Sequence, residues 1–255
     1  IRNLGRFGVK CICYNFMPVF DWLRTDLKTV ARDGSTSLSY CHEQLLKLDP
    51  HDLHLPGWDE SYTPEQLSGL IEEYSSVSYD KLFENLVYFL KGIMPACDET
   101  GINMAIHPDD PPWSMFGLPR IITGAESYER MIAAVPDKHN GFTFCTGSLG
   151  AGRFNDLVSM AKKYAGRIYF AHIRQLKYNG DTDFTEAGHL TSAGNLDIYG
   201  IVKALVEGGF DGYVRPDHGR NIWGEDGKPG YGLYDRALGA AYLNGLFEAI
   251  EKDGV

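Results

Sequence analysis

The stretch NMAIHPDD, residues 103–110, is a short apolar run that ends in a metal-competent side chain, His107. Three later stretches repeat this arrangement: FTFCTGS (142–148) ends at Cys145, IYFAHIR (168–174) at His172, and YVRPDHG (213–219) at Asp217. Short apolar runs bounded by turn-forming residues are typical of buried strands. These side chains lie 27 to 45 residues apart, which leaves room for a helix and two loops between strands. The sequence therefore predicts a parallel βα repeat in which each strand end supplies one metal ligand.

Helical patterns alternate with these strands. They cover about 125–134, 153–165, 195–207 and 233–251, between strands predicted at 102–107, 141–146, 167–173 and 211–216. Upstream, VKCICYNF (9–16) predicts a first strand, and YDKLFENLVYFLKGIMPACDETG (79–101) predicts a long helix that stops at Gly101. Alternation of this kind indicates a parallel sheet.

The fold class expected from this order is α/β, a (β/α)₈ TIM barrel of which the chain carries only about five βα units. An eight-stranded barrel needs three more units, so we expect an N-terminal portion upstream of Ile1. An open doubly wound sheet is the alternative for five strands alone.

Residues 1–255 are expected to form one domain with an irregular insert at about 17–62. The insert is rich in turn formers, with a short helical run near CHEQLLKL (41–48), and its length is typical of a functional lid. A helix is predicted to start after it at TPEQ (63–66), where Thr63 and Gln66 fit a capping box.

Composition limits the function classes. The formal charge is −10, and the basic residues are scattered, so we expect no nucleic-acid partner. The chain has no apolar run of about 18 residues and no secretory pattern, which predicts no membrane association and a cytoplasmic location. Its five scattered cysteines indicate a reducing compartment, and Cys11 and Cys13 are interpreted as small buried hydrophobic residues on one strand face.

Nucleotide cofactors and serine-hydrolase chemistry are not expected. TGSLG (146–150) lacks the first glycine of a nucleophile elbow, and GSLGAG (147–152) matches neither the dinucleotide nor the Walker pattern. Its glycines are interpreted as allowing a close approach of the backbone to a metal or substrate.

The four strand-end side chains offer nitrogen, sulfur and oxygen donors, which suit a divalent transition ion better than calcium or magnesium. Zinc, iron and manganese all remain open at this point. Three nearby arginines, Arg174, Arg215 and Arg220, are candidates for a pocket that binds a small anion. Among the other histidines, His189 can face the site, whereas solvated positions are expected for His42, His51, His54 and His139.

Several long strings resemble the mannonate dehydratase family, of the superfamily similar to xylose isomerase: CYNFMPVFDW, MAIHPDDPPW, FCTGSLGA, IYFAHIRQ, RPDHGR and PGYGLYDRALGAAYLNGL. The resemblance extends from Ile1 to Val255. It implies a TIM barrel whose fourth to eighth strands are those predicted here. It also implies dehydration of D-mannonate to 2-keto-3-deoxy-D-gluconate in hexuronate (glucuronate) breakdown, with Mn²⁺ or Fe²⁺.

Residue by residue, the resemblance implies a metal held by His107, Cys145, His172 and Asp217. His218 is the expected proton-transfer residue, because an imidazole can act as acid or base near neutral pH. Tyr231 is a second candidate, with Tyr234 as its rival. Family members also tend to associate, so a homo-oligomer is expected.

Two other functions fit the same sequence features. A metal-dependent sugar isomerase or epimerase can use the same barrel and similar ligands. A non-catalytic sugar-acid binding protein is the other class, against which the metal-ligand pattern and the lack of an export signal argue.

Overall fold

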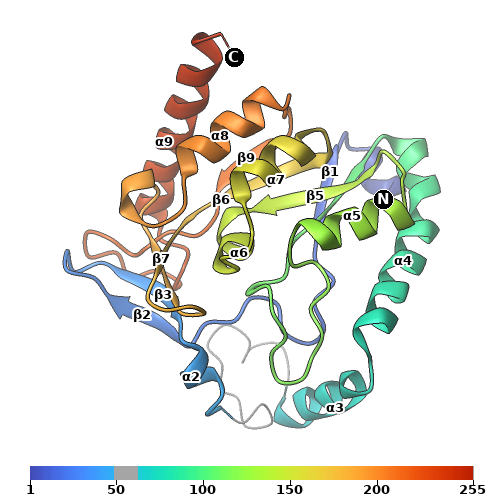
Figure 1. The fold of residues 1–255 in the computed structure, drawn as a ribbon, viewed down its shortest axis with the longest axis horizontal. Coiled ribbons are helices and arrows are strands. Elements are labelled where there is room, and N and C mark those ends of the chain that lie inside the picture. Colours follow the sequence, from blue (N-terminus) through green and yellow to red (C-terminus); the bar gives the residue numbers. More distant parts are fainter. Residues whose placement is uncertain (49–62, 255) are drawn as a thin grey trace.

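The computed structural model describes residues 1–48 and 63–254. Its main sheet has five strands in the order β1 (Cys11–Tyr14), β4 (Asn103–Ile106), β5 (Asn140–Cys145), β6 (Ile168–Ile173) and β9 (Tyr213–Pro216). Every neighbouring pair in this sheet is parallel. The predicted strands and their parallel pairing are confirmed (Figure 1). Because each neighbouring pair is parallel, all five carboxyl ends lie at the same edge of the sheet.

Helices connect the strands close to the predicted ranges. They are α1 (Arg2–Gly5), α3 (Pro64–Ser75), α4 (Tyr79–Thr100), α5 (Ala125–Ala134), α7 (Leu157–Tyr164), α8 (Ile198–Glu207) and α9 (Leu233–Lys252). The capping box is confirmed, since the Thr63 side chain accepts from the Gln66 backbone N–H and the Gln66 side chain accepts from the Thr63 backbone N–H. Helix α4 ends at Thr100, with Gly101 in the left-handed region.

A short helix that the sequence analysis did not predict, α6 (Thr146–Ala151), begins directly after Cys145. All six of its residues are buried, so tertiary packing holds the glycine-rich GSLGAG stretch in a helical turn.

A second, antiparallel sheet is a correction to the sequence analysis. Strands β2 (Asp26–Val30) and β3 (Thr36–Tyr40) form a hairpin within the stretch that was expected to be irregular. It pairs with a hairpin inserted after β6, in the order β2-β3-β8-β7, where β7 is Gln175–Tyr178 and β8 is Phe184–Ala187. The short helix α2 (His42–Leu45) follows β3, near the predicted helical run. Residues 49–62 of the expected lid lie outside the described residues.

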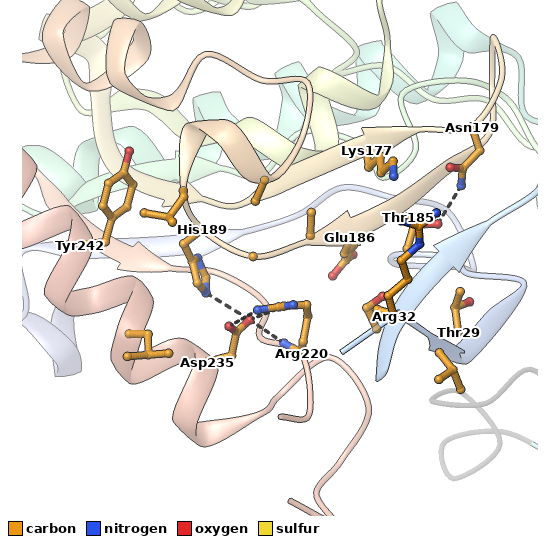
Figure 2. A pocket seen from close by; sticks show the side chains of 18 residues that line it. Thr29, Arg32, Lys177, Asn179, Thr185, Glu186, His189, Arg220, Asp235 and Tyr242 are labelled. Carbon is orange, nitrogen blue, oxygen red and sulfur yellow. Dashed lines mark hydrogen bonds and ion pairs between the residues drawn. The ribbon is translucent and has the colours of Figure 1, made fainter. Parts of the chain in front are cut away.

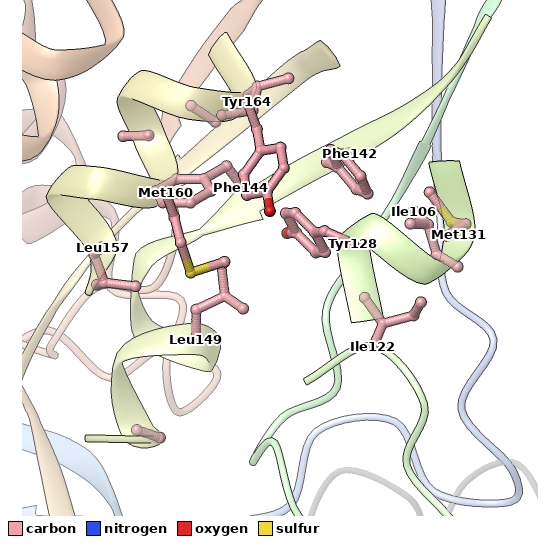
Figure 3. Packing of buried hydrophobic residues seen from close by; sticks show 14 of the residues in the cluster. Ile106, Ile122, Tyr128, Met131, Phe142, Phe144, Leu149, Leu157, Met160 and Tyr164 are labelled. Atoms are coloured by element: carbon pink, nitrogen blue, oxygen red, sulfur yellow. The ribbon is translucent and has the colours of Figure 1, made fainter. Parts of the chain in front are cut away.

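The hydrophobic core lies between the parallel sheet and its covering helices. All six residues of β5 are buried, as expected for a central parallel strand covered on both faces. Tyr128 of α5 stacks on Phe142 of β5 with ring centroids 3.6 Å apart, and Tyr164 of α7 meets both rings edge-on. Figure 3 shows this aromatic group among Met131, Met160, Leu149 and Leu157. The packing ties α5 and α7 to β5 and so fixes the strand that ends in Cys145.

Among the described residues, none of the helices combines the length and the apolar character needed to cross a lipid bilayer.

Candidate active site

Three of the four predicted metal ligands meet at the carboxyl edge of the parallel sheet. His107 follows β4, Cys145 ends β5, and His172 lies near the end of β6, directly paired with Cys145. One donor atom from each of these residues lies within 4.8 Å of the others. Adjacent parallel strands bring residues distant in sequence together here, as the sequence analysis predicted.

Asp217, the fourth predicted ligand, lies beside this group rather than within it. Its Oδ2 accepts from Cys145 Sγ at 3.4 Å, and its Oδ1 lies 3.4 Å from His172 Nδ1. The carboxylate also pairs with Arg174 Nε at 2.9 Å and with Arg215 Nη2 at 2.5 Å. Although burial opposes ionisation, interactions with His218, His172 and the positively charged Arg174 and Arg215 hold the Asp217 pKa well below its usual value. Asp217 is therefore an anion in contact with two of the other three residues.

The hydrogen bonding of the His107 and His172 imidazoles suits metal coordination. His107 Nδ1 lies 2.7 Å from the carbonyl oxygen of Pro108, which can only accept, so Nδ1 carries the proton and Nε2 is free to bind. Both ring nitrogens of His172 are buried and have no hydrogen-bond partner within residues 1–48 and 63–254. Burial lowers the His172 pKa well below 6.5, which keeps this ring neutral, the form that binds metals.

The local charge favours a cation. Burial disfavours the protonated form of His107, but interactions with Cys145, Asp217 and Asp110 raise its pKa to about 9. The Asp217 and Asp110 carboxylates also attract a metal ion, which would replace that proton. The unpartnered His172 nitrogens and the mixed nitrogen, sulfur and oxygen donors therefore fit a divalent transition metal.

A cavity of about 240 Å³ opens beside these residues. Of the sequence-predicted residues, it is lined by His107, His172, Arg215, Asp217, His218 and Tyr231. Asp217 and His218 are neighbours, yet both reach the cavity because β9 ends at Pro216 and the chain leaves the strand conformation there.

His218 is buried at the back of the cavity with its Nδ1 turned away from it. Nδ1 lies 2.8 Å from Glu186 Oε2 and 2.9 Å from Oε1. The rings of Trp22 and Tyr231 flank the imidazole with centroids 5.6 and 5.8 Å away.

The two candidate tyrosines differ in their position relative to the cavity. Tyr231 lines the cavity beside His218, whereas Tyr234 is half exposed and packs on Trp223. Burial raises the pKa of Tyr231 above 10, so its hydroxyl stays protonated and able to donate near neutral pH.

The three candidate arginines also differ in their position relative to the cavity. Arg215 lines the cavity, while Arg174 lies behind it, buried in ion pairs with Asp110, Glu186 and Asp217. Arg220 lies outside the cavity and pairs with Asp235 at 3.0 Å and Asp33 at 3.3 Å.

His189 belongs to a different cavity, of about 880 Å³, that opens between the antiparallel sheet and α9. Figure 2 shows its ring directed at Asp235, whose oxygen lies 3.7 Å away, with Arg220 on the same carboxylate. Of the histidines expected to be solvated, His139 is instead buried and bonded to Asn103, and His42 is half-buried beside Tyr40. His51 and His54 lie outside the described residues.

Several residues that line the cavity were missed by the sequence analysis: Asn15, Asp21, Trp22 and Asp110. Cys13 also lines it and accepts from the Thr143 hydroxyl at 3.1 Å, which corrects its interpretation as a buried hydrophobic residue. The alternation of side chains along β1 could have indicated part of this lining, because it places the polar Asn15 on the same strand face as Cys13.

Parallel strands joined by helices, with a metal-competent cluster at their carboxyl ends, are typical of the TIM-barrel-like class of folds. A magnesium-bound xylose isomerase-like TIM barrel from Mycobacterium smegmatis shares this fold, with a TM-score of 0.51 and 15% identity over 98% of this chain and 65% of that one. The model of the D-mannonate dehydratase (UxuA) family matches residues 1–254. The chain belongs to this family and is a lyase.

Relatives agree with this assignment. Mannonate dehydratases of Thermotoga petrophila and Oceanobacillus iheyensis are each 51% identical to this chain over 99% of its length, and it spans 73% of theirs. The crystal structure of mannonate dehydratase from Streptococcus suis serotype 2 superimposes with a TM-score of 0.90 at 46% identity, covering 99% of this chain and 70% of that one.

Proposed function

We propose that this chain catalyses the metal-dependent dehydration of D-mannonate to 2-keto-3-deoxy-D-gluconate, a step of hexuronate breakdown. The observation that carries the proposal is the meeting of His107, Cys145 and His172 within 4.8 Å at the strand ends of a D-mannonate dehydratase family member.

The proposed metal ligands are His107 Nε2, Cys145 Sγ, a ring nitrogen of His172 and the carboxylate of Asp217. Mn²⁺ and Fe²⁺ are the proposed metals. When bound, such an ion acts as a Lewis acid that offsets the negative charge developing beside the substrate carboxylate.

The reaction removes a proton from C2 and a hydroxyl group from C3, which leaves as water once it has taken up a proton. His218 is proposed to transfer a proton through Nε2, since Glu186 occupies Nδ1. Tyr231 is the proposed second donor, because its hydroxyl stays protonated near neutral pH. Arg215, which lines the cavity, is the proposed partner of the substrate carboxylate.

Incubation of the metal-loaded protein with D-mannonate tests the reaction. We expect a keto-deoxy acid lighter than the substrate by one water, detected by mass spectrometry. A product of unchanged mass would instead favour an isomerase or epimerase, and no turnover would favour a binding protein.

Elemental analysis tests the ligand set. His107→Ala and His172→Ala should each lose bound Mn²⁺, whereas His42→Ala, which changes a histidine outside the cavity, should retain it. Stoichiometric metal in both site variants would contradict the assignment.

The position of the five strands as the fourth to eighth of a closed eight-stranded barrel stays a prediction, supported by the superposition on the longer Streptococcus suis enzyme. The cytoplasmic location, the homo-oligomeric state and the substrate roles of Arg174 and Arg220 also stay predictions.

A further inference from the structure

Glu186 lies directly behind His218, although it comes from β8 of the inserted antiparallel sheet. Its side chain is buried, and its two oxygens have different partners. Oε2 faces His218 Nδ1 at 2.8 Å. Oε1, which lies 2.9 Å from the same nitrogen, also accepts from Arg24 Nη2 at 2.8 Å and from Arg174 Nη1 at 2.5 Å.

The two arginines that hold Oε1 are themselves fixed. Arg24 makes a two-pronged pair with Asp110, with both distances 3.0 Å, and Arg174 reaches the same carboxylate at 2.5 Å. All four side chains are buried, and their two positive and two negative charges cancel. A buried charged group is costly unless it is paired and hydrogen-bonded, and this arrangement meets that condition for Glu186.

The contact determines which ring nitrogen of His218 carries a proton. An ionised carboxylate can only accept, and Glu186 is paired with two guanidinium groups, those of Arg24 and Arg174. Burial opposes ionisation, but interactions with His218, Arg174 and Arg24 lower the Glu186 pKa to about 2. A neutral His218 therefore places its proton on Nδ1. Nε2 has no hydrogen-bond partner within residues 1–48 and 63–254 and remains as a lone pair on a residue that lines the cavity.

We propose that Glu186 is the positioning residue of the active site, which sets the tautomer and orientation of the His218 ring. The proposal rests on the proposed role of His218. It also assigns a function to the antiparallel sheet, which carries Glu186 on β8. Ser39 and Tyr40 of β3 pair with Thr185 and Phe184 of β8, so the two hairpins hold Glu186 in place from outside the parallel sheet.

Glu186→Gln tests the proposal without changing side-chain size. The two arginines require an acceptor at the Oε1 position, so the amide oxygen takes that place and the NH₂ group takes the place of Oε2. There it donates to His218 Nδ1, which forces the proton onto Nε2. The variant should therefore invert the tautomer of His218.

Nitrogen-15 NMR of histidine-labelled protein loaded with diamagnetic Zn²⁺ measures this inversion. Spectra are recorded at a pH at which the His218 ring is neutral, and His218→Asn identifies its signals. We expect protonated Nδ1 in the parent protein and protonated Nε2 in Glu186→Gln. The same tautomer in both proteins would overturn the proposal.

Kinetics separate positioning from a purely structural role. Glu186→Gln should lower kcat about 100-fold or more, with KM and metal content close to those of the parent. Glu186→Asp keeps an acceptor and should recover part of the lost kcat. It also keeps the Nδ1 tautomer, which provides the NMR test if Glu186→Gln does not fold. Arg24→Lys leaves the contact between Oε2 and His218 in place and should cost less kcat.

An equal loss of kcat in Arg24→Lys and Glu186→Gln, or a loss that follows falling metal content, would show that Glu186 is only structural. The NMR result does not depend on turnover. If His218→Asn keeps its activity, His218 has no catalytic role. The NMR measurement still tests whether Glu186 sets the tautomer of the His218 ring.

Discussion

Asp217 and His218 are adjacent in the sequence but are proposed to have different roles. On a regular strand two neighbours face opposite sides, yet both side chains line the cavity because β9 ends at Pro216. Asp217 contacts Cys145 and His172, whereas His218 is held from behind by Glu186. The proposed roles of Asp217 in metal binding and of His218 in proton transfer should therefore be separable by mutation, even at neighbouring positions.

His218→Asn should keep the fold and the bound metal but lose turnover, because the amide cannot accept a proton as an imidazole does. We expect kcat to fall by about 100-fold to 10,000-fold. Melting temperature and elemental analysis serve as the controls. Near-normal activity with D-mannonate would remove His218 from the mechanism.

Tyr231→Phe removes only the hydroxyl that lines the cavity, and kcat should fall by about tenfold or more if that hydroxyl donates a proton. Tyr234→Phe is the matched control, since Tyr234 is half exposed and packs on Trp223. Its kinetics should be unchanged. Equal kinetics in the two variants would show that the Tyr231 hydroxyl does not donate a proton and that the side chain only packs against its neighbours.

At the scale of elements, β5 carries Cys145 and depends on a close backbone contact. A Cβ placed on Gly141 would lie 2.3 Å from the Arg167 carbonyl oxygen and 2.3 Å from the Tyr169 ring. The carbonyl belongs to the segment that leads into β6, so it cannot yield without moving that strand. The register that pairs Cys145 with His172 therefore requires glycine at this position.

Gly141→Ala should lower the free energy of unfolding by about 1–3 kcal/mol, as overpacking does in well-packed interiors. Gly92→Ala is the matched change on the exposed face of α4, where a new Cβ meets nothing within 4 Å. It should raise the free energy by about 0.5–1 kcal/mol, because alanine favours helix. Denaturant unfolding measures both, and equal effects would contradict the steric argument.

At the scale of the whole molecule, the buried ion pairs join segments that are far apart in the chain. Arg24 contacts Glu186 across 162 residues and Asp110 across 86. These contacts connect the N-terminal part of the chain, the loop after β4 and the inserted hairpin. Protonation of the Glu186 or Asp110 carboxylate should therefore change the free energy of unfolding of the whole molecule.

The unfolding free energy should fall in acid. The Glu186 pKa drops from 4.5 to about 2 on folding, so its stabilisation is complete above about pH 4.5 and is lost as the pH falls towards 2. The loss is on the order of 3 kcal/mol. Melting curves should show a steeper acid loss for the parent than for Glu186→Gln, and parallel curves would contradict this assignment.

The sequence by itself determined the parallel strands, the helices between them and the candidate ligands at the strand ends. Each of these features is encoded locally, by an apolar run with one polar residue at its end or by a helical period with its cap. His107, Cys145 and His172 could therefore be placed at one edge once the strands were known to be parallel.

Only the tertiary structure decided the antiparallel sheet, the helical turn at GSLGAG, the distinction between Tyr231 and Tyr234, and the position of Glu186 behind His218. The hairpin strands are only four or five residues long. The contacts among Arg24, Asp110 and Glu186 join distant segments. Such contacts follow from how packed layers meet in space, which no local period of the sequence records.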